Sequence, residues 1–343
     1  MLLFAVMICI ALSSCGEKTK YSTYSLDYFD TVTTIIGYAD SREEFDQISA
    51  EILAELGEYH RLFTIYHRFE GLENLCTINA LQNGEHSVVS VDRRIIDLLV
   101  YSKEMYQKTG GRVNIAMGSV LSIWHDYRTA GLDEPSAAEL PPIERLAAAA
   151  EHTNIDDIII DEENCTVFLS DPEMSLDVGA IAKGYAVEMV ARTLEEKGIT
   201  GYVINVGGNV RTVGSKSDGD KWVAGVENPD AGSDEPYIAY LGLSGESLIT
   251  SGSYQRFYTV NGKNYHHIID SETLMPAEDY RSVSVVCQNS ADGDVLSTAL
   301  FCMSVEDGKA LLAQFDGAYA MWALDDGTQI FSDGFESYLT EIK

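Results

Sequence analysis

The dipeptide Asn261-Gly262 constrains the fold more than any other local feature of the chain. It lies within SLITSGSYQRFYTVNGKNYHHIID, residues 247–270, between two runs rich in β-branched and aromatic residues. Both central residues of a type I′ turn need positive φ, which Asn and Gly adopt readily. The pair therefore predicts two antiparallel strands joined by a tight hairpin, and any fold for this chain must accommodate antiparallel β-structure.

The rest of the second half alternates between β-rich and helical segments. Strands are predicted over residues 173–179, 201–214, 221–227, 282–288 and 318–324. Helices are predicted over residues 180–197, closed by Gly198, and from Asp294 to about Phe315.

The first half begins with a predicted strand over residues 31–38, and Ser41 and Glu44 then form the N-terminal signal of a helix. A second helix is expected over residues 92–108. The segment 112–124 begins like a strand and turns tightly at Gly118, residues 126–142 read as a loop, and 143–153 as a short helix. Residues 156–170 hold two β-runs around a turn at 162–164. Helices and hairpins without steady βαβ repetition favour an α+β fold, in one large domain or two intimate subdomains.

The chain is strongly acidic. Its 343 residues carry 54 Asp and Glu against 23 Lys and Arg, a formal net charge of -31, which makes a nucleic-acid partner unlikely. A phosphate ligand would need cations gathered locally. Beyond the first residues, Cys76, Cys165, Cys287 and Cys302 show no zinc-type spacing, so we interpret them as packed thiols and assign them neither a disulfide nor a metal.

The N-terminus has the pattern of a secreted lipoprotein. Residues 1–14 form an apolar run too short to span a bilayer, and Cys15 and polar residues follow. The sequence before Cys15 resembles a bacterial lipobox, which implies cleavage after residue 14 and lipid on Cys15. Residues 15–27 are then a tether, and residues 28–343 the folded domain. An ordinary signal peptide or a buried apolar segment remain the alternatives.

The stretch DVGAIAKGYAVE, residues 177–188, places Lys183 in the first turn of a predicted helix. A helix N-terminus already carries partial positive charge, so a lysine there is unfavourable unless an anion such as phosphate binds. Gly179 and Gly184 would permit close approach of backbone or ligand, and Asp177 would accept a hydrogen bond from it. The alternative is that Lys183 faces solvent and Asp177 caps the helix.

The segment SADGDVLSTALF, residues 290–301, offers a second candidate site. Asp294 and Thr298 are four residues apart, so they share a helix face and present a carboxylate and a hydroxyl together. Hard oxygen ligands supplemented by substrate phosphate suit Mg²⁺. The alternative is capping by Asp292 or Asp294.

The adjacent His266 and His267 offer a third site. Neighbouring residues of a strand face opposite ways, so at most one of the two lines a given pocket, as a general base or ligand contact. A packed or solvent-facing histidine is the alternative. Asp270 leads a turn and is expected to bond its backbone.

Taken together, DVGAIAKGYAVE, YVINVGGNV, ITSGSYQRFY, YHHIIDSETLMPA and DGDVLSTALF, in this order after a lipobox, closely resemble the ApbE family of FAD:protein FMN transferases. The resemblance covers essentially all of the mature chain. It implies an α+β fold of two subdomains with mixed or antiparallel sheets and packed helices, and FAD bound in the cleft between them. It also implies Mg²⁺-dependent transfer of FMN from FAD to a threonine of an acceptor protein, with release of AMP.

Site residues follow from the resemblance position by position. Mg²⁺ would be held by the side chains of Asp294 and Thr298 and by the carbonyl of Ala180. The chain departs from common family patterns at Phe29, Ser119 and Ser297, where members often have Met, Pro and, in some, an acidic residue. The positions that match family contacts to FAD are Phe29, Tyr66, Ala116, Met117, Gly118, Asp177, Lys183 and His267.

The implied reaction needs a base near the threonine hydroxyl, for which His267 is the first candidate and Asp294 the second. The implied partners are FAD and an extracytoplasmic acceptor flavoprotein, and the implied location is the outer face of the cell membrane, through lipid on Cys15. Two alternatives remain. One is a Mg²⁺-dependent FAD pyrophosphatase that gives FMN and AMP, and the other is a lipoprotein that binds FAD without chemistry.

Overall fold

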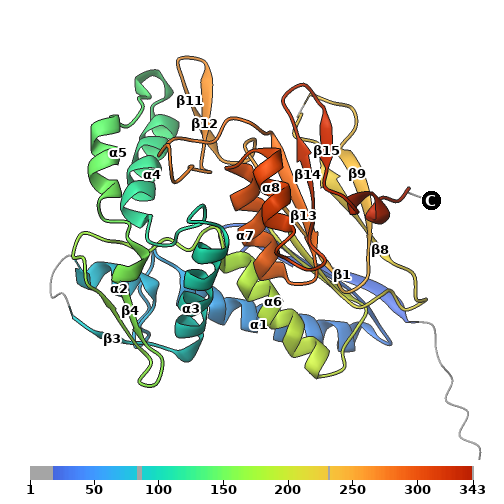
Figure 1. Ribbon diagram of the computed structural model, residues 1–343. Helices are drawn as coiled ribbons and strands as arrows, with labels where there is room; N and C mark the ends of the chain where they lie inside the picture. Colours follow the sequence, from blue (N-terminus) through green and yellow to red (C-terminus); the bar gives the residue numbers. More distant parts are fainter. Residues whose placement is uncertain (1–17, 83–86, 231, 342–343) are drawn as a thin grey trace, which may run out of the picture.

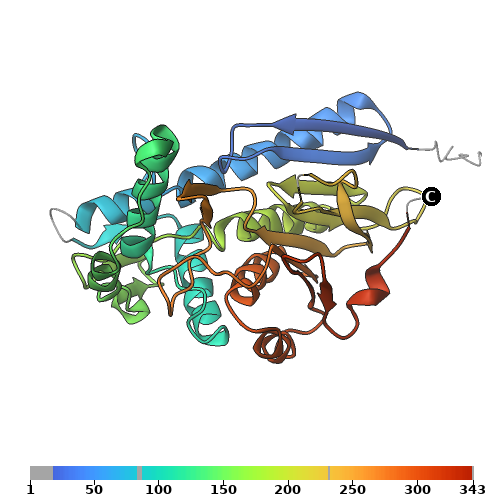
Figure 2. The same cartoon turned by 90° about the horizontal axis from the view of Figure 1, so that it is seen from above.

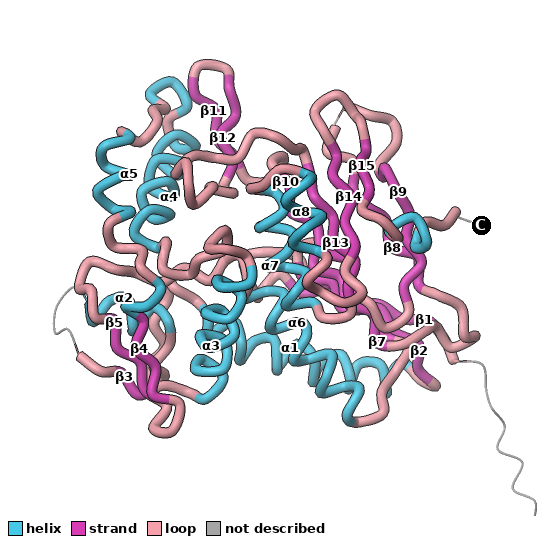
Figure 3. The backbone as a smooth tube through the Cα atoms, viewed as in Figure 1, coloured by secondary structure: helices cyan, strands magenta, loops and turns pink. Residues whose placement is uncertain are grey.

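The computed structural model describes residues 18–82, 87–230 and 232–341. Figure 1 and Figure 3 show one large sheet with helices against it, and a smaller group of helices and a hairpin at the opposite side of the molecule. The predicted signal peptide and Cys15 lie outside the described residues. No helix in the described ranges is long and apolar enough to cross a membrane.

The large sheet has eight strands, and every pair of neighbours is antiparallel. This confirms the α+β class. In spatial order the strands are β1 (Thr19–Ser25), β2 (Thr33–Ala39), β6 (Tyr202–Val206), β7 (Asn209–Val213), β10 (Ser247–Gly252), β13 (Ser282–Cys287), β14 (Tyr319–Ala323) and β15 (Gln329–Phe331).

The chain has eight helices in the described ranges. They are α1 (Arg42–Phe63), α2 (Leu75–Gln82), α3 (Arg93–Lys108), α4 (Gly118–Asp133), α5 (Ile143–Ala150), α6 (Ala182–Glu196), α7 (Ser290–Phe301) and α8 (Val305–Leu312). Of these, α1, α6 and α7 contact strands of the large sheet. Helix α6 contacts α1 and α7, and α7 lies on β10 and β13. Figure 2 shows α1 running beside the β1–β2 hairpin at one edge of the molecule.

Short 3-10 turns and three small sheets complete the architecture. The turns are η1 (Pro135–Ala137), η2 (Ile155–Asp157) and η3 (Phe335–Tyr338). The small sheets are β3 (Val89–Ser90), β5 (Thr166–Leu169) and β4 (Ile158–Asp161) in that order, β8 (Trp222–Glu227) with β9 (Tyr237–Leu243), and β11 (Phe257–Val260) with β12 (Lys263–His266).

The β11–β12 hairpin, α4 and α5 pack around a second apolar core of their own, distinct from the main core. Trp124 of α4, Leu146 of α5 and Tyr258 of β11 are almost fully buried in this second core. The main core, by contrast, lies between the large sheet and α1, α3, α6 and α7. This division provides the expected two parts of the fold.

Several predicted elements are confirmed in detail. Asn261 and Gly262 have φ values of 50 and 82 and join β11 to β12, as a type I′ turn requires. Ser41 caps α1: its Oγ accepts from the Glu44 N–H at 3.1 Å. Likewise, α3 begins directly after its cap Asp92.

Other predictions are wrong at the level of local structure. Residues 173–179 form no strand and make only a single bridge, between Ser175 and Met117. Residues 112–117 are likewise not a strand, and Gly118 begins a helix that continues to Asp133, into the predicted loop. Residues 201–214 form the two strands β6 and β7 instead of one, because Gly207 and Gly208 adopt positive φ and reverse the chain.

The last predicted helix also differs. It begins at Ser290, with Asn289 as its cap, and breaks at Cys302 before α8 starts after Ser304. Asp294 and Thr298 therefore lie inside α7, and the alternative that Asp292 or Asp294 caps the helix is wrong. The segment predicted as a tether, residues 15–27, contains β1, which pairs with β2 along its whole length.

Candidate functional site

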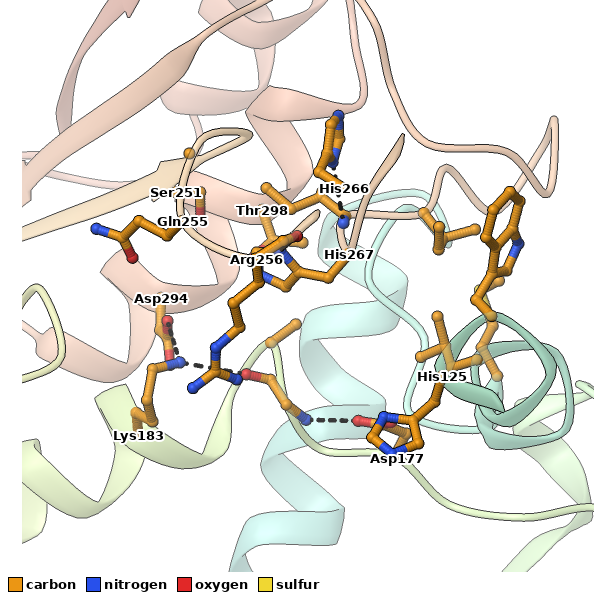
Figure 4. Close-up of a pocket in the computed structure, with 18 of the residues that line it drawn as sticks. His125, Asp177, Lys183, Ser251, Gln255, Arg256, His266, His267, Asp294 and Thr298 are labelled. Atoms are coloured by element: carbon orange, nitrogen blue, oxygen red, sulfur yellow. Dashed lines mark hydrogen bonds and ion pairs between the residues drawn. The ribbon is translucent and has the colours of Figure 1, made fainter. Parts of the chain in front are cut away.

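A cleft of about 400 Å³ lies between the main body and the unit formed by α4 and the β11–β12 hairpin. Figure 4 shows side chains from both parts pointing into it. The cleft brings together most of the candidate residues from separate parts of the sequence. Those that line it are Tyr66, Met117, Asp177, Ala180, Lys183, His267, Asp294 and Thr298.

One wall of the cleft is built where α6 and α7 meet almost in backbone contact. A Cβ atom on Gly184 would lie 2.4 Å from the carbonyl oxygen of Ser290 and 2.5 Å from the Cβ of Asp294. Only glycine permits this approach. As a result the Gly184 N–H donates directly to Oδ2 of Asp294 at 2.8 Å.

Gly184 lies in the first turn of α6, where backbone N–H groups have no acceptor within the helix. The carboxylate of Asp294 accepts from one of these free donors. The carbonyl of Ala180 lies just before the helix and borders the same cleft through its residue. The carboxylate of Asp294 is only 4% exposed, and only its Oδ1 is not engaged by Gly184.

The chemistry of these donors fits Mg²⁺. A carboxylate, a hydroxyl and a backbone carbonyl are hard oxygen ligands, and their small number leaves positions for water and substrate phosphate. No group of three or more His, Cys, Asp or Glu side chains in the described ranges is arranged to hold a metal ion. An ion at Asp294 and Thr298 would therefore need oxygens of water or substrate to complete its coordination.

Lys183 lies beside this donor group. Its Nζ is 3.7 Å from Oδ1 of Asp294 and donates to the carbonyl of Gly179 at 3.4 Å. Figure 4 shows the Lys183 side chain next to the carboxylate of Asp294. The alternative that Lys183 simply faces solvent is wrong.

Asp177 bonds the loop before α6 and also faces the cleft. Its Oδ1 accepts from the Gly179 N–H at 2.8 Å, within the loop. The alternative that Asp177 caps the helix is wrong, because the N-cap of α6 is Ile181. Burial away from water raises the pKa of Asp177. The hydrogen bond from Gly179 and the charges of His125, Lys183 and Arg128 act in the opposite direction. One carboxylate thus both shapes the loop and lines the cleft.

The side chains of His266 and His267 point in opposite directions, as expected for neighbouring residues of a strand. His266 is buried: its Nε2 donates to the Ala277 carbonyl at 2.6 Å, and its Nδ1 accepts from Ile268 N–H at 3.2 Å. His267 points into the cleft, and its Nδ1 lies 3.3 Å from the carbonyl of Arg256. Since a carbonyl only accepts, Nδ1 carries the proton in this contact and Nε2 keeps a free lone pair.

The surroundings of His267 strongly favour its neutral form. More than a third of the surface of residue His267 is exposed, yet protein atoms crowd around its side chain. This desolvation, followed by the positive charges of Arg256, His266, Lys183 and Arg128, lowers the pKa of His267 to about 3. An anion bound among these cations would reduce their effect and return the pKa toward its usual value.

The remaining candidates take other positions. Phe29 lines a smaller adjoining pocket of about 130 Å³, which also includes Tyr66, Asp177 and Lys183. Ala116 is fully buried and does not line either pocket. Gly118 also lies outside both, and a Cβ there would meet the Ser175 carbonyl at 2.4 Å. Gly118 and Ala116 thus fix the backbone on either side of Met117, which does line the cleft.

The chain departs from the common family pattern at Ser297 and Ser119, and the hydroxyl groups of both serines make hydrogen bonds within the protein. The Oγ of Ser297 lies 2.8 Å from that of Ser251, beneath the cleft, and also donates to the carbonyl of Asp294 at 3.0 Å. Ser119 donates to the carbonyl of Ala149 and ties α4 to α5.

The sequence did not single out two arginines that line the cleft, Arg128 and Arg256. Arg128 bonds His125 Nδ1 at 3.0 Å, and Arg256 donates to the carbonyl of Asp30 at 3.2 Å. Arg128 lies in the segment read as a loop, so no helical spacing drew attention to it. In a chain of net charge -31, cations gathered in one cleft indicate an anionic ligand.

Comparison with known proteins gives a consistent result. The model of the ApbE family matches residues 24–322. A protein of Klebsiella pneumoniae named FAD:protein FMN transferase is 33% identical over 282 residues, which cover 79% of this chain and 84% of that protein. A protein of Treponema pallidum with the same name is 30% identical over 342 residues, covering 94% of this chain and 90% of its own length.

Solved structures match over the same extent. The crystal structure of the ApbE protein from Thermotoga maritima has a TM-score of 0.81 and 26% identity, and the match covers 94% of this chain and 100% of that one. The flavin transferase ApbE from Vibrio cholerae has a TM-score of 0.75 at 24% identity, with 94% and 100% covered, which supports the fold.

Proposed function

The chain belongs to the ApbE family, and from that premise we propose that it transfers FMN from FAD to a threonine hydroxyl of an acceptor protein in a Mg²⁺-dependent reaction that releases AMP. The two relatives named FAD:protein FMN transferase, which align with most of the chain, support FMN transfer from FAD to an acceptor protein. The geometry of the cleft supports the metal and the roles of individual residues, whereas the acceptor threonine is carried over from the family resemblance.

The observation that carries the proposal is the meeting of α6 and α7. Asp294 and Thr298 of α7 line one cleft with Ala180 and Lys183, which lie at the start of α6. When bound there, Mg²⁺ would offset the charge of a pyrophosphate and polarise the phosphorus to be attacked. Lys183, at the N-terminus of α6, adds positive charge close to the same phosphates.

His267 is suited to take the proton of the attacking hydroxyl. Its Nδ1 is held by the Arg256 carbonyl, which orients the ring and leaves Nε2 as the accepting nitrogen. Its depressed pKa keeps the imidazole neutral at physiological pH, which a base requires. Neutralisation of the neighbouring cations by the substrate would make the ring a stronger base at the moment when it is needed. Asp294 is a poorer candidate because Gly184 and the metal would engage its oxygens.

Arg128 and Arg256 complete the charge balance of the site. Their side chains reach the cleft from α4 and from the loop before β11. Two phosphates of FAD carry more negative charge than Lys183 alone can offset, so these arginines and the metal share the compensation. The acceptor threonine would have to reach the FAD phosphates in this same cleft.

The decisive experiment incubates the protein with FAD and an acceptor domain that carries a flavinylation threonine, with and without Mg²⁺. Asp294→Asn is the test variant. Asp292→Asn is its matched control, because Asp292 lies on the same helix and bonds the Tyr101 hydroxyl instead of facing the cleft. We expect covalent flavin fluorescence on the acceptor with Mg²⁺ in the parent and the control, and its loss in Asp294→Asn.

Two outcomes would replace this proposal. Equal release of FMN and AMP with and without acceptor, and no labelled acceptor, would make the protein an FAD pyrophosphatase. Tight FAD binding without turnover in Mg²⁺, while a related transferase labels the same acceptor, would make it a flavin-binding protein without chemistry.

We further propose that lipid on Cys15 anchors the enzyme to the extracytoplasmic face of the cell membrane, where its acceptor flavoprotein also resides. The support is the lipobox-like sequence before Cys15. The parent is expected to incorporate radiolabelled palmitate in growing cells, and a Cys15→Ser variant is not. Equal labelling of the two proteins, or no labelling of the parent, would contradict the anchor.

A further inference from the structure

The position of Lys183 has a consequence beyond binding phosphate. Its Nζ contacts Oδ1 of Asp294 at 3.7 Å and the carbonyl of Gly179 at 3.4 Å. The side chain of Asp294 is 5% exposed and that of Lys183 27% exposed, so water screens the pair only partly. The ammonium thus interacts with a carboxylate oxygen and a loop carbonyl at the edge of the main cleft.

These partners overlap with the donors of the proposed metal site. Oδ1 is the oxygen of Asp294 that Gly184 does not engage, and Gly179 immediately precedes Ala180. A divalent cation at Oδ1 would lie within a few ångströms of the ammonium in its present position. Two positive charges at such a distance repel strongly in a partly desolvated site, so they do not share Oδ1 without rearrangement.

We propose that Lys183 is a built-in counter-ion, which holds Asp294 in the metal-free enzyme and moves onto the substrate phosphates when a divalent cation takes its place. This inference rests on the proposed function of the cleft. Lys183 then competes with the metal when no flavin is present and favours the metal when FAD is bound. Its four rotatable side-chain bonds allow the ammonium to move without a change in the backbone.

The inference makes metal and substrate binding interdependent. In the parent enzyme the metal must displace Lys183 from Asp294, which weakens metal binding until FAD offers the ammonium new partners. The increase in metal affinity caused by FAD equals the increase in FAD affinity caused by the metal. Removal of the ammonium should strengthen metal binding in the absence of FAD and reduce this mutual increase.

The test is a titration of the full chain with Mn²⁺, followed by electron paramagnetic resonance of the free ion, first without flavin. Lys183→Met removes the ammonium but keeps a long side chain. Lys197→Met is the matched control: it removes the same charge at the opposite end of α6, where Lys197 pairs with Glu51 at 2.9 Å, away from the cleft. Subtraction of an Asp294→Asn titration isolates this site from other acidic sites on the surface.

We expect Lys183→Met to bind Mn²⁺ about fivefold more tightly than the parent without FAD, the scale of one partly exposed ion pair. Lys197→Met should match the parent. If the parent binds no Mn²⁺ at this site without FAD, the inference requires that Lys183→Met does. The titration is then repeated with FAD, where the ratio of affinities with and without FAD should be smaller in Lys183→Met than in the parent.

The inference is overturned if, without FAD, the Mn²⁺ affinity of Lys183→Met is no higher than that of the parent. It is also overturned if the affinity of Lys183→Met rises no more than that of Lys197→Met. An unchanged ratio of affinities with and without FAD would overturn it as well. Loss of Mn²⁺ in Asp294→Asn alongside such a result would leave the proposed metal site standing. Unchanged Mn²⁺ binding in Asp294→Asn would instead refute the metal site itself, and with it the competition at Asp294.

Discussion

Substitution of Gly184 by alanine tests whether the contact between α6 and α7 sets the geometry of the site. The new Cβ would lie 2.4 Å from the Ser290 carbonyl oxygen, whereas ordinary contacts begin at 3.4 Å, so the helices must separate locally by about 1 Å. The Gly184 N–H to Asp294 Oδ2 distance, 2.8 Å at present, would then approach 3.8 Å, which is beyond a hydrogen bond.

The energetic consequence has opposing contributions. Overpacking of this kind costs about 1–3 kcal/mol, and the weakened hydrogen bond to a buried carboxylate costs a further ~1–2 kcal/mol. Alanine regains about 1 kcal/mol through its higher helix propensity. We therefore expect the free energy of unfolding to fall by about 2 kcal/mol, with Mn²⁺ affinity reduced about tenfold or more because second-shell geometry orients the ligands.

The assay pairs urea unfolding with Mn²⁺ titration and acceptor labelling. Gly242→Ala on β9 is the control, because its Cβ would meet only the flexible Lys221 side chain at 3.2 Å and no backbone atom closer than 3.9 Å. We expect its free energy of unfolding to change by less than about 0.5 kcal/mol. If Gly184→Ala keeps parental stability, Mn²⁺ affinity and labelling, the close approach of the two helices does not determine the site.

Three further predictions concern buried or crowded groups. The pKa of His267 is lower in the folded than in the unfolded protein, so the unfolded chain takes up a proton first as pH falls from about 6.5 toward 3, and the free energy of unfolding decreases. The decrease between neutral and mildly acidic pH should be smaller in His267→Gln than in the parent, as measured by urea unfolding at the two pH values. Glu188→Gln should lower the free energy of unfolding by about 3 kcal/mol in urea, because it removes one charged partner of the buried Arg211, whose side chain is 5% exposed. A decrease no larger than that caused by Glu196→Gln, at an exposed position, would contradict this prediction. Burial raises the pKa of Cys302 to about 12 and raises that of Cys287 further, so both thiols should react with a disulfide reagent only after unfolding, and a fast native reaction at either, located by peptide mapping, would disprove it.

The sequence predicted elements well where a local signal and the tertiary structure agree. Asn261-Gly262 demanded a hairpin, and the structure has one. The segment 173–179 failed for an instructive reason. Met174, Leu176 and Val178 are all buried, so the alternation typical of a strand is real, but the segment pairs with no neighbouring strand and serves as a packed loop.

The break between α7 and α8 had a local signal that apolar periodicity concealed. Ser304 caps α8 and accepts from the Asp307 N–H at 3.1 Å, in a serine-to-acid spacing of the capping type. The apolar positions continue on both sides of the break, so the segment reads as one helix. Tertiary packing, rather than propensity, decides where the chain bends.

The site was predictable in part. Asp294 and Thr298 share a helix face, and Lys183 lies at a helix N-terminus, as their spacing indicated. Their proximity to each other could not be derived from spacing, because it depends on Gly184 and on the packing of α6 against α7. Arg128 and Arg256 were missed because an isolated arginine carries no pattern in the sequence.

The hydrogen bond between Gly184 and Asp294 joins residues 110 positions apart in the chain. A ribosome must therefore synthesise almost the whole protein before the two halves of the proposed metal site exist together. A nascent or truncated chain that ends before α7 would lack the carboxylate of Asp294 and the hydroxyl of Thr298. If the cleft binds a metal as proposed, ligands from both helices are available only after α7 has packed against α6.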